Sequence, residues 1–277
     1  MNLLIFDTET TGLKNAELIE FAGIVKYSDG TIKDSGLMQQ MVYNMCPIQK
    51  ILPSSIVIHG ITPEKAKEYE SPDIVVPRIF AAICKLPKPL VLVAHNIAYD
   101  VEIMNSSFQK YMKKPFQPKL FIDTLKLAKH LIPDCKIGGY KLDAIFYYLY
   151  PDRLDEMLAK RAIHRALDDC ELTYDVLIGL KKIYDKQLDR ESTWEEVIAL
   201  AAAPMNLSET EWKFGKHKGT KLKNTPKGYV NWCLTSDFGK DPRNADIIYT
   251  LKKLHGIKPE IKKVDNPVPK AKEEFLF

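Results

Sequence analysis

Two carboxylates follow the first apolar run of the chain. Leu3 to Phe6 are all apolar, and Asp7 and Glu9 come directly after them. A short run without polar residues predicts a strand buried on both faces in the middle of a sheet. Because side chains alternate along a strand, Asp7 and Glu9 should project to one side and Thr8 to the other. Two carboxylates this close to a core repel each other and lose hydration, so they need a compensating cation.

No Lys or Arg in this strand supplies the compensating charge. A divalent metal ion would supply it. A ligand set made only of oxygen atoms favours a hard ion such as Mg²⁺ or Mn²⁺. The sequence therefore predicts a metal site where the first strand ends.

Two further carboxylates fall near other strand ends and helix starts. Asp100 begins an expected helix just after a second apolar strand, Leu90–Ala94, and such ends converge in α/β sheets. A carboxylate there can also have a purely structural role, because its negative charge interacts favourably with the positive end of the helix dipole. Within an expected helix over residues 161–186, Asp169 lies on a small, largely apolar stripe, whereas Asp168 lies on a charged stripe and is expected at the surface.

A histidine, His164, stands five residues before Asp169. Histidine titrates near neutral pH and can act as a general base. A single histidine near a helix start is also commonly a structural hydrogen-bonding group. His59, His95 and His130 are rival candidates for a catalytic role.

These segments resemble three motifs of the DEDD superfamily of 3′→5′ exonucleases, which have a ribonuclease-H-like fold and include the proofreading subunits of bacterial replicative polymerases. Residues 7–13 resemble the first motif, His95-Asn96 with Asp100 the second, and residues 164–169 the third. Residues 59–62 and 123–125 are also similar to the family. Arg165 stands where another branch has tyrosine, so the chain resembles the histidine branch, called DEDDh or DnaQ-like. Three motifs in order over residues 1–186 make the resemblance specific.

The resemblance implies a catalytic set. Asp7, Glu9, Asp100 and Asp169 would hold two divalent metal ions, one activating water and the other stabilising the leaving 3′ oxygen. His164 would take a proton from that water. The residues implied to contact the substrate are Thr8, Glu9, Thr10, Gly12, Leu13, His59, His95 and Asn96.

The order of expected elements predicts an α/β protein: a ribonuclease-H-like mixed five-stranded sheet flanked by helices, plus a small α+β C-terminal module. Three antiparallel strands open the sheet, with residues 28–30 as a hairpin turn. We expect the exonuclease domain at residues 1–186 and the module at residues 192–257. The module should start with a helix capped by Ser192 and Glu195. A flexible charged tail is expected at residues 258–277.

Residues 212–223 interleave aromatic residues, lysines and glycines. They resemble the small C-terminal module of exodeoxyribonuclease X-like proteins, whose Phe-Gly-Lys-x-x-Gly core corresponds to residues 214–219. Lysines can contact phosphates and exposed aromatic rings can stack on bases. The lysines expected to contact nucleic acid are Lys213, Lys216, Lys218 and Lys221. Alternatively, Trp212, Phe214 and Trp232 form the core of a small domain and the lysines are simply solvated.

The last three residues, Phe275, Leu276 and Phe277, weakly resemble the peptides by which bacterial replication proteins dock on the sliding clamp. Glu273 replaces the glutamine that usually starts such peptides. The resemblance suggests a polymerase or the clamp as a partner.

Composition predicts an ordinary soluble protein. The net charge is only +4, so any nucleic-acid-binding surface must be local. Five scattered cysteines without a C-x-x-C pair argue against a disulfide framework or a zinc site and favour a reducing compartment. No basic leader precedes an apolar segment and no run is long enough to span a bilayer. We expect a cytoplasmic protein.

Together these features predict a metal-dependent 3′→5′ exonuclease that releases nucleoside monophosphates from DNA 3′ ends, in repair or proofreading. Two alternatives stay open. One is a 3′→5′ exoribonuclease with the same chemistry. The other is an accessory subunit that binds nucleic acid, a polymerase or the clamp through its C-terminal half.

Overall fold

The computed structural model describes residues 1–26, 39–132, 134–161, 165–241 and 244–257. It divides the chain into two compact units. The first spans Met1–Ala201, and the second comprises the described residues from Ala202 onward. His164 and the C-terminal Phe275, Leu276 and Phe277 lie outside the described residues.

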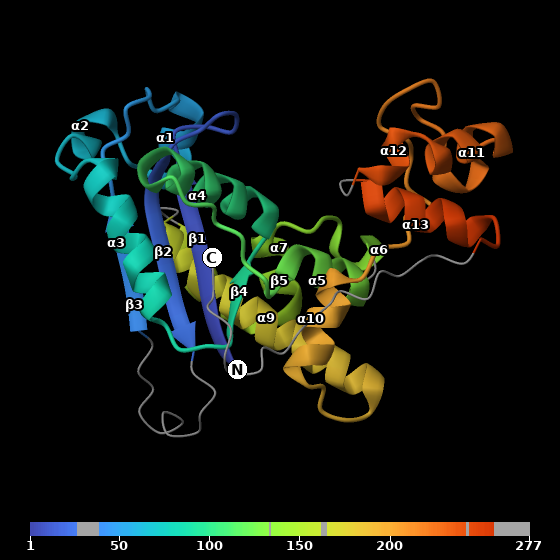
Figure 1. The fold of residues 1–277 in the computed structure, drawn as a ribbon. Helices are drawn as coiled ribbons and strands as arrows, with labels where there is room; N and C mark the ends of the chain where they lie inside the picture. Colours follow the sequence, from blue (N-terminus) through green and yellow to red (C-terminus); the bar gives the residue numbers. More distant parts are fainter. Residues whose placement is uncertain (27–38, 133, 162–164, 242–243, 258–277) are drawn as a thin grey trace. The chain divides into compact units, whose positions relative to one another are not determined.

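A mixed five-stranded sheet lies at the centre of the first unit (Figure 1), which confirms the predicted fold class. The strand order is β3-β2-β1-β4-β5. The pairs β1–β2 and β2–β3 are antiparallel, and β1–β4 and β4–β5 are parallel. The strands are β1 (Asn2–Thr10), β2 (Leu18–Lys26), β3 (Gln39–Asn44), β4 (Leu90–Ala94) and β5 (Phe121–Asp123).

Alternate residues of β1 pack into two different cores. Leu3 and Ile5 join a core that includes α5 (Thr124–Leu131), α7 (Leu142–Leu149), α9 (Ala166–Leu188) and α10 (Trp194–Ala202). Leu4 and Phe6 join a core that includes α3 (Pro72–Lys85) and α4 (Ile97–Met112). Since the alternation continues along the strand, it also decides which side the polar residues that follow will face.

Shorter elements complete the first unit. They are α1 (Pro53–His59), α2 (Pro63–Ala66), α6 (Asp134–Ile137), the 3₁₀ helix η1 (Pro151–Arg153) and α8 (Leu154–Arg161). The helix predicted over residues 161–186 is wrong at its start: α8 ends at Arg161 and α9 begins only at Ala166. In the described residues no helix has the length and apolar character that crossing a membrane requires.

Helix α10 was expected to open the C-terminal module, but it packs in the first unit. Val197, Ile198 and Ala201 are buried in the same core as α9, so the units separate near residue 202 rather than at 192. The capping box also lies one residue later than predicted. Thr193 Oγ1 accepts from the Glu196 N–H at 3.2 Å, and the Glu196 carboxylate accepts from the Thr193 N–H at 2.9 Å.

The second unit is built mainly from short helices around an indole. Trp212 is buried, and its indole N–H donates to Thr225 Oγ1 at 2.8 Å. Of the β structure expected here, the described residues contain one isolated antiparallel bridge, Glu211 with Lys221. The elements are η2 (Leu222–Asn224), α11 (Lys227–Thr235), α12 (Asp237–Lys240) and α13 (Ala245–Leu254).

Candidate active site

Three carboxylates from distant parts of the first unit meet beside β1. Asp7 and Glu9 continue the side of the strand that carries Leu3 and Ile5, the side covered by α9. Asp169 lies in the first turn of α9. Carboxylate oxygens of Asp7, Glu9 and Asp169 lie within 4.8 Å of one another. The predicted alternation along β1 therefore brings these three acidic groups together.

Asp100, the fourth predicted carboxylate, is not one of the three whose oxygens lie within 4.8 Å of one another. It is buried in the first turn of α4 and accepts a hydrogen bond of 2.7 Å from Thr8 Oγ1. Burial raises the pKa of Asp100, and the Thr8 hydrogen bond opposes that rise. The negative charge of Asp100 still acts on Glu9, whose pKa it helps to raise.

Burial and neighbouring carboxylates disfavour the ionised form of Glu9. Burial, followed by repulsion from Asp169, Glu20 and Asp100, raises the pKa of Glu9 to about 8, and Arg165 lowers it only in part. The ligands on offer are carboxylate oxygens held within one small volume. Such a donor set suits a hard divalent ion such as Mg²⁺ or Mn²⁺, which would favour the ionised carboxylates.

Glu20 and Arg165, which the motif analysis did not assign to the site, support it. Glu20 pairs across the strands with Glu9 and is 1% exposed. Its carboxylate accepts from Arg165 Nη2 and, at 3.2 Å, from Arg165 Nε. It also accepts from the Ala166 N–H at 3.1 Å, which caps the start of α9. Glu20 thus holds in place the helix that carries Asp169. The signal in the sequence was one acid inside the otherwise apolar run 18–25.

The residues after β1 form a hydrogen-bonded turn. Thr10 Oγ1 donates to the Gly12 carbonyl at 2.7 Å, and the Tyr99 hydroxyl donates to the same carbonyl at 2.9 Å. Thr10 is buried, whereas Leu13 is 85% exposed. Of these predicted substrate contacts, Leu13 is therefore open to a ligand, and Thr10 and Gly12 shape the turn. Tyr99 is a structural member of this region that the sequence analysis did not single out.

The predicted histidine contacts are engaged within the protein. His59 is 1% exposed, its Nδ1 accepts from the Ile61 N–H at 3.0 Å, and burial lowers its pKa. His95 Nδ1 lies 3.0 Å from Thr124 Oγ1, and its Nε2 lies 3.0 Å from the Tyr140 carbonyl. Both ring nitrogens of His95 thus contact protein groups, whereas His59 Nε2 is buried without a hydrogen-bond partner among the described residues.

Asn96 occupies the turn between β4 and α4. It adopts a left-handed conformation with φ of 65°, and its N–H donates to Asp123 Oδ1 at 3.0 Å. The same Asp123 oxygen caps α5 by accepting from the Leu125 N–H at 3.0 Å. The Asn96 side chain is exposed. It is therefore accessible to a ligand, as the resemblance implies.

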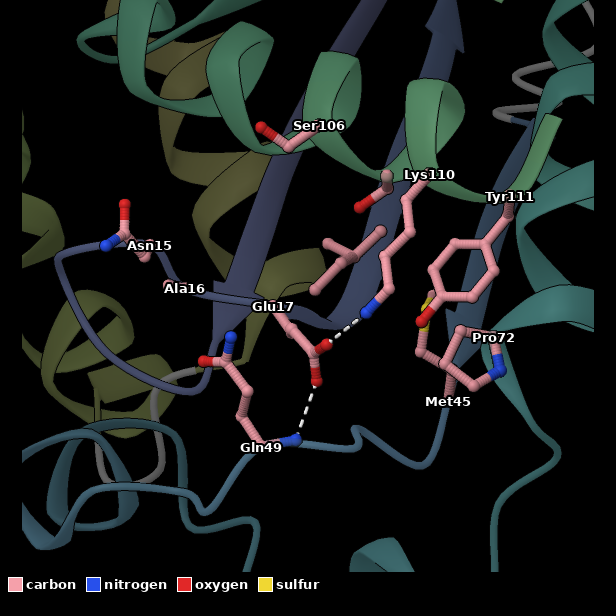
Figure 2. Close-up of a pocket in the computed structure, with 11 residues that line it drawn as sticks. Asn15, Ala16, Glu17, Met45, Gln49, Pro72, Ser106, Lys110 and Tyr111 are labelled. Atoms are coloured by element: carbon pink, nitrogen blue, oxygen red, sulfur yellow. Dashed lines mark hydrogen bonds and ion pairs between the residues drawn. The ribbon is translucent and has the colours of Figure 1, made fainter. Parts of the chain in front are cut away.

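A pocket of about 260 Å³ lies elsewhere in the first unit (Figure 2). No residue predicted for the catalytic or substrate site lines it. Glu17 in this pocket accepts from Lys110 Nζ at 2.6 Å and from the N–H groups of Ile48 and Gln49 at 2.7 and 2.8 Å. Partial burial acts to raise the pKa of Glu17, but these hydrogen bonds outweigh it, and the pKa is lowered.

Known proteins similar to this chain include polymerases far longer than it is. The chain is 30% identical over 179 residues to a PolC-type DNA polymerase III of Caldanaerobacter subterraneus subsp. tengcongensis. It is 31% identical over 139 residues to that of Streptococcus pyogenes serotype M1. The matches cover 64% and 49% of this chain but 11% and 9% of those proteins. The chain thus spans about a tenth of the length of these relatives.

Solved structures with a similar fold include nucleases bound to DNA. E. coli Exonuclease I in complex with a dT13 oligonucleotide has a TM-score of 0.51 and 19% identity, covering 68% of this chain and 42% of that one. Exonuclease X in complex with 5′ overhanging duplex DNA has a TM-score of 0.49 and 26% identity, covering 72% of this chain and 99% of that one. The similarity to Exonuclease I is one of fold.

A family model described as "Exonuclease" matches residues 4–177, from β1 into α9. This range includes all three carboxylates of the cluster and the sheet that positions them. The chain therefore belongs to the exonuclease family, the ribonuclease-H-like, DnaQ-like 3′→5′ exonucleases that its motifs resemble.

Proposed function

We propose that this protein is a metal-dependent 3′→5′ exonuclease that releases nucleoside monophosphates from DNA 3′ ends. The observation that carries the proposal is the meeting of Asp7, Glu9 and Asp169, whose carboxylate oxygens lie within 4.8 Å of one another. A partly buried cluster of this kind, with Glu9 buried, is costly unless a cation joins it. In a member of the exonuclease family, the carboxylates would be held together because hydrolysis of a phosphodiester needs a metal ion bound to them.

The proposed roles follow from the positions of the side chains. Asp7, Glu9 and Asp169 would hold divalent metal, with Asp100, oriented by Thr8, as the fourth carboxylate of a two-ion site. Two bound ions would supply an activated water and a stabilised leaving oxygen. His164 would take the proton of the attacking water. The water oxygen bonds to phosphorus as the bond to the 3′ oxygen breaks, which yields a nucleoside 5′-monophosphate and a shortened 3′ end.

Substrate contact is proposed for two exposed residues, Leu13 and Asn96, which are open to a terminal nucleotide. It is also proposed for Thr8 and Glu9, which are buried but belong to the strand that bears Asp7. We propose that His59 and His95 instead keep the surrounding loops in shape, because His59 Nδ1 and both ring nitrogens of His95 contact protein groups.

DNA is the proposed substrate because the relatives are DNA polymerases and the similar Exonuclease I structure holds a dT13 oligonucleotide. The direct test is a time course on end-labelled single-stranded, double-stranded and mismatched DNA and on matched RNA, with Mg²⁺ or with chelator. We expect Mg²⁺-dependent release of nucleoside monophosphates from the 3′ end, faster on DNA than on RNA. Because the 2′-hydroxyl is the main local difference, preference for the RNA strand would favour the exoribonuclease alternative.

The same time course separates an enzyme from an accessory subunit. Turnover by the isolated protein identifies an enzyme. A folded protein that binds DNA but releases no nucleotide with Mg²⁺ or Mn²⁺ would overturn the proposal. The clamp partner proposed for Phe275, Leu276 and Phe277 has its own test, a pull-down with purified clamp and a variant lacking these three residues. Equal capture of both proteins would refute that partner.

A further inference from the structure

The second unit exposes aromatic rings that its core does not use. Trp212 is 2% exposed and fills the core, as the core interpretation of the sequence predicted. Phe214 and Trp232, by contrast, are 46% and 48% exposed. Two large, half-exposed aromatic residues on a unit of this size indicate a candidate binding surface.

Neighbouring rings hold these two residues in place. Trp232 lies against Tyr229, with centroids 5.2 Å apart and planes 18° apart, and against Phe238 at 5.8 Å. Phe214 also lies against Phe238, at 5.9 Å. A ring already fixed by its neighbours loses little conformational freedom when a ligand stacks on it.

Lys216 and Lys218 lie on a tight loop, and Lys216 contacts one of these rings. Lys216 Nζ lies 5.2 Å from the centroid of the Tyr229 ring. The loop is closed by hydrogen bonds from the Lys218 N–H to the Gly215 carbonyl at 3.2 Å and from the Gly219 N–H to the Trp212 carbonyl at 2.9 Å. Lys216 and Lys218 are exposed. The sequence from residue 202 to 257 has ten Lys and Arg residues against five Asp and Glu residues.

We propose that Phe214, Trp232, Lys216 and Lys218 form a binding surface for single-stranded nucleic acid. Bases would stack on the two rings and the lysines would face phosphates. Exposed aromatic residues alone would also suit a protein partner, but the excess of positive charge selects a polyanion. Lys221 is a weaker candidate, because it pairs with Glu209 at 3.1 Å. The surface extends the proposed nuclease function by giving the substrate strand a second point of attachment.

The first test measures stacking on Trp232. Full-length protein is titrated into a labelled dT oligonucleotide with chelator present, so that binding is followed by fluorescence anisotropy without cleavage. We expect Trp232→Ala to weaken binding about 5- to 100-fold and Trp232→Phe to retain most of the affinity. Quenching of tryptophan fluorescence by the oligonucleotide should fall in Trp232→Phe, because the other two tryptophans are packed in cores: Trp212 is buried, and Trp194 packs partly buried in the first unit. Melting curves of each variant check that the unit stays folded.

The second test measures phosphate contact without touching the packed rings. The double variant Lys216→Gln, Lys218→Gln should reduce the slope of log Kd against log salt by about 1.4, since each single-strand phosphate contact contributes roughly 0.7. Lys253→Gln, an exposed lysine on α13, is the matched control and should leave the slope unchanged. Wild-type affinity and slope in both Trp232→Ala and the lysine double variant would overturn the proposal. Because chelator removes catalysis from the assay, failure of the proposed nuclease activity would not alter these results.

Discussion

Glu9 and Glu17 lie at the two ends of the connection from β1 to β2, and the protein treats their charges in opposite ways. Glu17 receives hydrogen bonds from Lys110 and two backbone N–H groups, and its pKa is lowered (Figure 2). Glu9 lies in a group of carboxylates, and its pKa is raised to about 8. The chain itself balances the charge of Glu17. In the cluster, Arg165 lowers the pKa of Glu9 only in part, and a bound cation would balance the remaining negative charge.

The contrast separates a carboxylate whose charge is balanced by the protein from carboxylates that repel one another. A fully satisfied carboxylate such as Glu17 contributes to the folded state and has no spare ligand to offer. A cluster that destabilises the metal-free fold has oxygens ready for an ion.

The largest effect is expected from removing a carboxylate of the cluster. Asp7→Ala or Asp169→Ala should abolish Mg²⁺-dependent nucleotide release, a loss above about 10³-fold or roughly 4 kcal/mol in transition-state stabilisation. The metal-free melting temperature should hold or rise, because a like charge has gone. Asp168→Ala, next to Asp169 on α9, is the control and should keep activity within a few-fold. Near wild-type activity in either variant would refute the assignment of these residues.

Mutation of the proposed general base should affect metal binding differently from mutation of a proposed metal ligand. His164→Ala is expected to reduce the rate about 10²- to 10⁴-fold while Mn²⁺ binding, followed by titration calorimetry, stays intact. Asp7→Ala should lose both properties together. Loss of metal binding in His164→Ala would show that His164 belongs with the ligands and not with the proton transfer.

Glu20→Gln should produce an intermediate loss, because Glu20 acts through α9 rather than on the substrate. The variant leaves Arg165 without its charged partner and weakens the cap at Ala166. We expect a roughly tenfold fall in kcat with little change in KM, and weaker Mn²⁺ binding. The loss of stability should be about 1–3 kcal/mol. In a double-mutant cycle, the variant carrying both Glu20→Gln and Arg165→Gln should lose less stability than the sum of the losses in the two single variants. A change in stability alone, with unchanged kcat and metal binding, would limit Glu20 to a structural role.

This pair also shows what the sequence could and could not predict. The apolar strands β1 and β4 and the α/β fold class were predictable because burial on both faces leaves an unbroken apolar run. Alternation along β1 predicted that Asp7 and Glu9 share a side, and the stripe on α9 predicted that Asp169 faces inward. That the three meet was implied by the family resemblance, and the structure brings them together. The cap of α9 was not predictable, because its acceptor, Glu20, lies 146 residues earlier in the chain.

The boundary between the two units was less predictable, because it too depends on contacts between residues far apart in the sequence. The local capping signal before α10 shows where a helix starts but not which core it will join. The helix packs with α9 because Val197, Ile198 and Ala201 complete the apolar core there. In the second unit, aromatic residues spaced for a core include both the buried Trp212 and the half-exposed Trp232, and only the fold distinguishes them.

The stability of the metal-free protein should depend on pH through Glu9. The pKa of Glu9 is raised from 4.5 to about 8 on folding, so the folded state holds this proton more tightly than the unfolded state does. The free energy of unfolding should therefore fall as pH rises from about 4.5 to about 8. Mg²⁺ should raise the melting temperature, and by more at pH 8 than at pH 5. A Mg²⁺ effect independent of pH, measured by scanning fluorimetry with and without chelator, would contradict the raised pKa.

The smallest effect is expected at Glu17, where the charge is already balanced. Lys110→Met removes an ion pair whose lysine is half-exposed and whose glutamate is 13% exposed, and should cost at most about 1 kcal/mol, less at high salt. The sign with pH is opposite to that of Glu9. With a lowered pKa, Glu17 contributes stability above its unfolded value of 4.5 and loses it as pH falls through the folded value. Lys110→Met should therefore reduce resistance to acid and leave nucleotide release within about twofold. A loss of activity as large as that of Asp7→Ala would mean that the pocket of Glu17 and the carboxylate cluster act as one site.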